Sequence, residues 1–149
     1  MPSTKQMMPR LRTGGFTLIE LLVVLVILGL LAGIVAPNVI RYLGRAKTDT
    51  ARVQIEQLDH AIEQFYLDNG RYPSGDDGLN ALVTPPGQAS NWHGPYLKKG
   101  VPKDPWGNAY LYRTPGQRSH GPYDLYSLGR DGQEGGTGED ADIGNWDSQ

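Results

Sequence analysis

The feature that most constrains this chain is a long apolar run near its start, from Phe16 to Ala36, in which Glu20 is the only charged residue. A bilayer core about 30 Å thick is crossed by roughly 20 helical residues, so the run predicts one membrane-spanning helix. A carboxylate costs roughly 2.5–3.5 kcal/mol at mid-membrane and less near the interface. We therefore expect Glu20 to meet a compensating positive group, and we treat it as a first indication of function.

The segment before the run is short and basic. Residues 1–15 carry Lys5, Arg10 and Arg12 and no acidic residue. Positive charge before an apolar span keeps that end in the cytoplasm, so the part after the span is expected to be translocated. The alternative is an ordinary signal peptide, cut among the small residues at 32–36. Its apolar core usually has only about 7–15 residues, and a carboxylate has no use in a discarded segment, so we favour a retained span.

A second helical pattern follows the apolar run. After Pro37, apolar residues recur at three- to five-residue steps as far as Asp68, which is typical of one helix face. Asn69 and Gly70 can cap its end. The two patterns together predict one long helix from Phe16 to about Asp68, half in lipid and half outside.

Short strands are expected in the last third of the chain. Residues 109–112 follow a turn at 105–108 and are expected to form a strand, and residues 123–128 alternate aromatic or apolar residues with others after a second turn at 115–121. Residues 71–100 indicate loops, with one helical turn at 78–83. We therefore predict an α+β fold in which the long N-terminal helix packs on a small antiparallel sheet. The chain has no cysteine, so it folds without disulfides.

The last segment, residues 131–149, combines acidic residues and glycines with no Lys or Arg. Carboxylates in a compact loop repel one another unless a cation holds them, and Ca²⁺ takes six to eight oxygens from carboxylates and backbone carbonyls. The segment does not match the EF-hand pattern. A disordered acidic tail is the alternative, although Ile143 and Trp146 favour a tail that docks onto the domain.

The sequence offers no catalytic constellation. His60, His93 and His120 are scattered, and there is no G-x-S-x-G, no H-E-x-x-H, no Walker loop and no cysteine nucleophile. The net charge is −2 and no basic stripe is visible, which argues against a nucleic-acid partner. We therefore expect no enzymatic activity.

Several motifs together resemble one known family. Residues 15–20, GFTLIE, resemble the class III signal of type IV pilin-like proteins. Three later motifs are similar to the major pseudopilin of type II secretion, the protein G family: FYLDNGRYP at 65–73, KDPWGN at 103–108 and YSLGRDG at 126–132. The resemblance covers the chain from about residue 13 to its end.

This resemblance implies how the N-terminus is processed. A membrane peptidase would cut between Gly15 and Phe16 and the new amine of Phe16 would be methylated. The resemblance thus implies a cleaved leader, a transmembrane and filament-core helix, and a periplasmic domain, at 1–15, 16–36 and 37–149. Glu20 would pair with the new amine of a neighbouring subunit. It also implies Ca²⁺ in the C-terminal loop, held by the Leu128 carbonyl and the side chains of Asp131, Glu139, Asp140 and Asp142.

The function implied is structural. Subunits would wait in the inner membrane, with the N-terminus cytoplasmic and the C-terminal domain periplasmic, and would then polymerise into a pseudopilus that helps to export folded proteins across the outer membrane. The partners would be other copies of the chain, minor pseudopilins, the inner-membrane assembly platform and the prepilin peptidase, with energy from a separate ATPase. Two alternatives remain: a type IV pilus major pilin, which usually closes a C-terminal loop with a disulfide, and a membrane-tethered or secreted calcium-dependent hydrolase.

Overall fold

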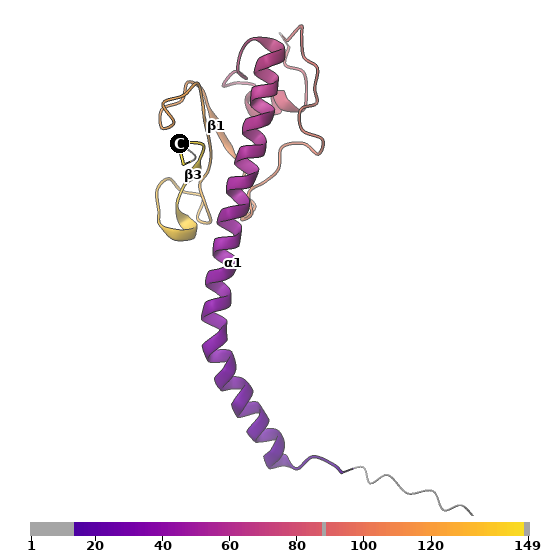
Figure 1. The fold of residues 1–149 in the computed structure, drawn as a ribbon, viewed down its shortest axis with the longest axis vertical. Coiled ribbons are helices and arrows are strands. Elements are labelled where there is room, and N and C mark those ends of the chain that lie inside the picture. The colour runs from indigo at the N-terminus through magenta and orange to yellow at the C-terminus, as the bar shows by residue number, and fades with distance from the viewer. Residues whose placement is uncertain (1–13, 88, 148–149) are drawn as a thin grey trace, which may run out of the picture. The chain divides into compact units, whose positions relative to one another are not determined.

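The computed structural model describes residues 14–87 and 89–147, so most of the predicted leader lies outside the described residues. The chain divides into two units, Met1–Ile40 and Arg41–Gln149. The elements in chain order are α1 (Leu18–Asn69), the 3₁₀ helix η1 (Gly78–Leu82), β1 (Leu111–Arg113), β2 (Asp124–Ser127), the 3₁₀ helix η2 (Gly138–Asp140) and β3 (Ile143–Gly144). Figure 1 shows the three strands beside the second half of α1.

The long helix predicted from the two apolar patterns is confirmed. α1 has 52 residues and continues as helix through Pro37. In the first unit every described residue, from Gly14 to Ile40, is exposed. Among the described residues α1 is the one helix long and apolar enough to cross a membrane. In an aqueous environment an apolar surface of this extent is unfavourable unless lipid or protein covers it, because the burial of each CH₂ contributes about 0.8 kcal/mol of stabilising free energy.

In the second unit, α1 buries one face in a single core. The buried residues of this face recur at helical spacing and include Ile55, Leu58, Ile62 and Phe65. They form one cluster with apolar residues of η1, of the sheet and of the segments around it: Leu79, Leu82, Tyr110, Tyr123, Leu125 and Ile143. The amphipathic pattern therefore reflects packing of the helix against the domain.

The sheet is antiparallel in the order β1-β2-β3, with Leu111 opposite Tyr126 and Tyr126 opposite Gly144. The predicted α+β fold is confirmed, although the strands are shorter than expected and β3 was not predicted. β3 has two residues, too few for an alternating pattern, and it forms because β2 offers it a partner. All four residues of β2 are buried, whereas the alternation indicated a half-buried strand.

Tyrosine hydroxyls join the domain to polar groups on α1. Tyr110 donates a hydrogen bond of 2.6 Å to Gln54, and Tyr123 donates one to Asp59. Burial raises the pKa of Tyr110 and, together with the Asp59 hydrogen bond, that of Tyr123. Both hydroxyls therefore remain protonated donors at neutral pH, and they fix the sheet in register along the helix.

Candidate functional site

The predicted processing site lies directly before α1. Gly15 and Phe16 are exposed, and the Phe16 residue is 83% accessible. Nothing approaches within 4 Å of the space where a side chain at Gly15 would lie. The peptide bond between these two residues is therefore open to a peptidase.

Glu20 forms a capping box with Thr17 at the start of α1. The Glu20 N–H donates to Thr17 Oγ1 at 3.3 Å, and the Thr17 N–H donates to Glu20 Oε2 at 3.5 Å. This reciprocal pair satisfies two backbone donors that the first helical turn leaves free. The sequence analysis missed this role, although the T-x-x-E pattern before an apolar run is its known signature.

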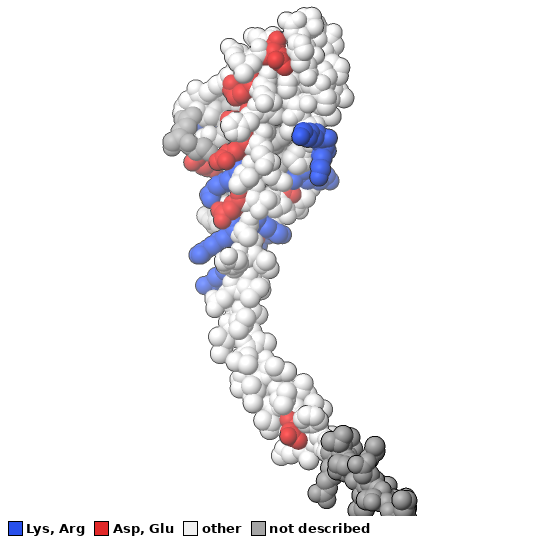
Figure 2. All heavy atoms as spheres, turned by 45° about the vertical axis from the view of Figure 1, so that its right-hand side comes forward, with Lys and Arg blue, Asp and Glu red and all other residues white. Residues whose placement is uncertain are grey.

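The position of Glu20 also suits its charge. The N-terminus of a helix carries partial positive charge, which favours a carboxylate in the first turn. Glu20 is the single charged side chain in residues 14–40. Figure 2 shows an isolated acidic group on the otherwise uncharged part of the helix. The capping box thus holds one carboxylate in a defined place, two residues into the helix, while leaving it exposed to other molecules.

Two arginines from outside the acidic C-terminal segment balance its charge. Arg130 binds Asp140 through two parallel hydrogen bonds of 2.8 Å. Arg118 Nη1 lies 2.6 Å from Asp142 Oδ2, which also accepts the Gly135 N–H at 3.1 Å. Arginines of the protein itself therefore balance part of the negative charge that the sequence predicted for this loop. No local sequence pattern indicates the Arg118–Asp142 pair, because the two residues are 24 positions apart.

The five residues predicted to bind the metal lie in or beside one loop, but the carboxylates among them bind different groups of the protein. Asp131 accepts the Gln133 N–H at 3.1 Å, and Glu139 accepts the Trp106 Nε1–H at 3.3 Å. Leu128 lies half-buried just after β2. Within residues 14–87 and 89–147, no three acidic or histidine side chains gather in a cluster that holds a metal.

One oxygen of the loop nevertheless suits a cation. The Asp142 side chain is only 6% exposed, and its Oδ1 is buried without a hydrogen-bond partner among the described residues. A buried carboxylate oxygen without a donor is costly, and a bound cation is one way to satisfy it. The unpartnered Asp142 Oδ1 is therefore the feature of this loop that fits a bound cation such as Ca²⁺.

Two of the sequence motifs form the frame beneath this loop. In KDPWGN, Asp104 Oδ1 accepts the N–H groups of Trp106 and Asn108 at 3.1 and 2.8 Å, which fixes the turn. In YSLGRDG, Ser127 Oγ donates to Asp104 Oδ2 at 2.6 Å, and the Gly129 carbonyl accepts the Asn108 amide at 3.0 Å. These motif residues are therefore structural, and they hold the strand that leads into the loop.

Asp124 in β2 is a second buried carboxylate that the sequence analysis missed. It is fully buried, and it accepts the N–H groups of Gln117, Arg118 and Ser119, the shortest at 2.8 Å. Burial alone would raise the pKa of Asp124, but the backbone donors outweigh it and hold the pKa at about 2. Asp124 thereby orders the turn that carries Arg118 to Asp142.

An exposed Gly15–Phe16 segment, a capped apolar helix and a small α+β domain are together typical of a pilin-like subunit. The family described as "Prokaryotic N-terminal methylation motif" matches residues 10–36. The family described as "Type II secretion system (T2SS), protein G" matches residues 38–146. The chain belongs to the type II secretion protein G family, and the resemblance of its motifs is thereby confirmed.

Individual relatives agree with this assignment. The chain is 51% identical to the type II secretion system core protein G of Pseudomonas aeruginosa, over 95% of this chain and 100% of the relative. It is 49% identical to that of Vibrio cholerae, over 91% and 92%. The crystal structure of the major pseudopilin from the type 2 secretion system of enterohaemorrhagic Escherichia coli matches with 32% identity and a TM-score of 0.63, over 74% of this chain and 96% of that one. The family is one of structural subunits.

Proposed function

We propose that this chain is the major structural subunit of a type II secretion pseudopilus. In this role it polymerises through α1 and helps to export folded proteins across the outer membrane. The observation that carries the proposal is the first unit: an apolar helix exposed along its whole length, with one capped carboxylate at its start. Such a surface needs lipid before assembly and other copies of itself afterwards. The 51% identity to a type II protein G favours this role over a pilus pilin or a hydrolase.

The processing and topology follow from the same unit. Residues 1–15 are the leader, residues 16–36 cross the inner membrane, and residues 37–149 form the periplasmic domain. The N-terminus is cytoplasmic in this proposal, because Lys5, Arg10 and Arg12 precede the span with no acidic residue among them. The partners are other copies of the chain, minor pseudopilins, the assembly platform and the prepilin peptidase, which cuts after Gly15.

Glu20 is the assembly contact. Cleavage creates an amine at Phe16, and in an apolar filament core a bare amine and a bare carboxylate are both costly. Pairing the amine of one subunit with Glu20 of its neighbour offsets both costs and fixes the axial register. The capping box supports this role, because it already holds the carboxylate in one place.

Calcium is the proposed structural ion of the C-terminal loop, where it would neutralise carboxylates and hold the backbone turns. The support is the buried, unpartnered Asp142 Oδ1. The residues that would hold the ion are the Leu128 carbonyl and the side chains of Asp131, Glu139, Asp140 and Asp142. Because Asp140 and Asp142 are each paired with an arginine, Ca²⁺ would compete with these pairs.

The test separates membrane insertion from polymerisation. Glu20→Ala should fractionate with the inner membrane as the wild type does, because removing a charge favours insertion, but it should form no filaments. Glu20→Asp keeps the carboxylate and should retain part of the assembly. Filaments of normal number and length from Glu20→Ala would contradict the pairing.

A further inference from the structure

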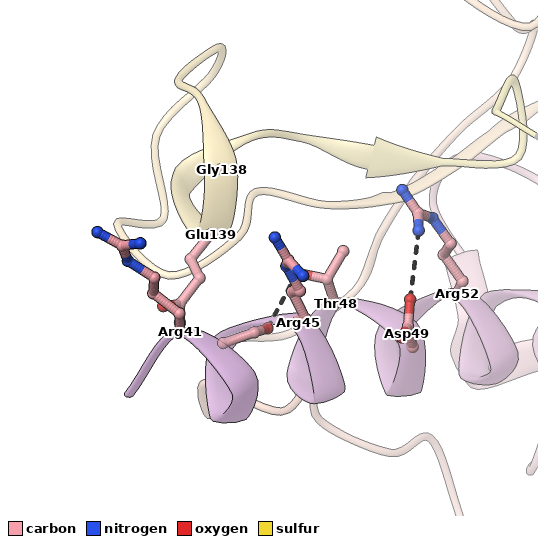
Figure 3. Close-up of a pocket in the computed structure, with 8 residues that line it drawn as sticks. Arg41, Arg45, Thr48, Asp49, Arg52, Gly138 and Glu139 are labelled. Atoms are coloured by element: carbon pink, nitrogen blue, oxygen red, sulfur yellow. Dashed lines mark hydrogen bonds and ion pairs between the residues drawn. The ribbon is translucent and has the colours of Figure 1, made fainter. Parts of the chain in front are cut away.

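An open groove of about 530 Å³ lies where the C-terminal loop passes over α1 in the second unit. Its α1 side carries three arginines, Arg41, Arg45 and Arg52, and its loop side carries Glu139. Figure 3 shows the three guanidinium groups on the side of α1 that faces the loop. The proposed function assigns no role to this groove.

The three arginines lie on one side of a short stretch of α1. At 100° per residue, Arg41, Arg45 and Arg52 lie within about 40° of one another around the helix axis. Arg52 pairs with Asp49 at 3.4 Å, but both side chains are more than half exposed, so this pair contributes little. Among the described residues, no carboxylate forms an ion pair with Arg41 or Arg45. The Glu139 carboxylate is engaged by Trp106 at 3.3 Å. The first two guanidinium groups are therefore available to an anion.

Charge is segregated along this part of α1. The first charged residues after the apolar run are Arg41, Arg45 and Lys47, whereas residues 53–69 contain four acidic residues and no Lys or Arg. Figure 2 shows several basic groups at the start of the second unit, and both acidic and basic groups farther along it. Basic residues shortly after a membrane span oppose translocation of the segment that follows the span. The basic residues at 41–47 therefore favour a negatively charged partner close to the membrane.

The position of a tyrosine also indicates that this part of α1 lies at the membrane surface. Tyr42 lies between the two arginines and is 76% exposed. Tyrosine is enriched where a membrane helix passes the headgroups, because its ring is apolar and its hydroxyl is polar. The order of an apolar run, then Arg41, Tyr42 and Arg45, is therefore that of a helix leaving a bilayer at the headgroup layer.

We propose that Arg41 and Arg45, extended by Arg52, bind the phosphate of an anionic phospholipid headgroup of the phosphatidylglycerol type in the periplasmic leaflet. Guanidinium groups bind phosphate through two parallel hydrogen bonds, which suits a phosphodiester at the mouth of this groove. The contact holds the waiting subunit at a fixed depth and ends when the subunit enters the filament. This inference rests on the proposed function, because it requires the subunit to wait in the membrane.

The experiment measures lipid binding to the full-length chain in mild detergent by native mass spectrometry. The chain is titrated with phosphatidylglycerol or phosphatidylcholine, each with and without millimolar inorganic phosphate. The test variant is Arg41→Gln/Arg45→Gln. The matched control is Lys98→Gln/Lys99→Gln, which removes the same charge from two exposed lysines outside the groove.

Each cation near an anionic surface strengthens binding about fivefold, so the arginine variant should bind phosphatidylglycerol roughly 25-fold more weakly. Phosphatidylcholine has the same phosphodiester but no net charge, so it should bind the wild type more weakly and lose less affinity in the arginine variant, and the lysine control should stay within about twofold of the wild type. Three results would overturn the inference: equal weakening in the control, equal binding of the two lipids by the wild type, or displacement of phosphatidylglycerol by inorganic phosphate.

Filament assembly of the same variants distinguishes the remaining cases. If Arg41→Gln/Arg45→Gln keeps its phosphatidylglycerol affinity but forms no filaments, the arginines bind a neighbouring copy and the inference is overturned. If the wild type neither fractionates with the membrane nor forms filaments, the proposed function fails. If only the lipid-binding inference fails, the wild type still fractionates with the membrane and still forms filaments.

Discussion

Gly129 should tolerate no side chain, because two separate costs meet there. Its φ is +69°, in the left-handed region. A Cβ on Gly129 would also lie 2.7 Å from the Glu139 carbonyl oxygen and 2.8 Å from that of Ala141. Both contacts are with backbone, so a rotamer change cannot relieve them. The Arg130 N–H donates to that same Glu139 carbonyl at 2.8 Å, which fixes the two segments against each other.

Gly138 provides a matched control for Gly129→Ala. Its φ is +65°, nearly the same, but nothing approaches within 4 Å of the position of its Cβ. Gly138→Ala should therefore cost only the left-handed conformation, about 1–2 kcal/mol. Gly129→Ala should cost that amount and also about 1–3 kcal/mol of overpacking. The difference between the two variants isolates the contact between Gly129 and the backbone at 139–141.

The assay is urea unfolding of residues 41–149, which form a compact unit by themselves, followed by circular dichroism. With a slope of about 1–3 kcal/mol per molar urea, an extra 1–3 kcal/mol shifts the midpoint by roughly 1 M between the two variants. Equal midpoints for Gly129→Ala and Gly138→Ala would refute the reasoning. They would show that the loop does not pack on Gly129 as described.

Two further predictions concern the buried carboxylates. Because the pKa of Asp124 is lowered from 3.8 to about 2, its contribution of about 2 kcal/mol is full above pH 4 and is lost as the pH falls towards 2. Asp124→Asn should therefore destabilise residues 41–149 most at pH 7 and progressively less below pH 4, whereas the exposed Asp76→Asn should match the wild type; a constant deficit would contradict the assignment. Ca²⁺ at about 100 times its Kd should stabilise the same unit by about 2.7 kcal/mol, and Asp142→Asn should remove this gain. An unchanged Tm of the wild type with and without Ca²⁺ would indicate a loop held by its arginines alone.

Features set by local pattern were predictable from the sequence. The length of α1 followed from an apolar run and a 3.6-residue period, and neither signal needs information from elsewhere in the chain. The Thr17–Glu20 capping box was equally predictable, because T-x-x-E before an apolar run is a local pattern. The capping box gives a second reason for a carboxylate at this position, besides the proposed pairing with a neighbouring subunit.

Features set by contacts between distant segments were not predictable. β3 exists because β2 offers hydrogen bonds, and Arg118 reaches Asp142 only because Asp124 folds the turn beneath it. The acidic segment at 131–149, considered without the rest of the chain, therefore appeared to lack positive charge. The arginine groove could not be predicted either, since it requires the C-terminal loop to return to α1.

We propose that this chain is a processed subunit that assembles through its N-terminal helix. The most direct measurement is N-terminal sequencing with mass spectrometry of the chain recovered from isolated filaments. The account predicts subunits that begin at Phe16 and carry one N-methyl group. A chain that is absent from filaments and recovered from the periplasm with its N-terminus near Pro37 would contradict it.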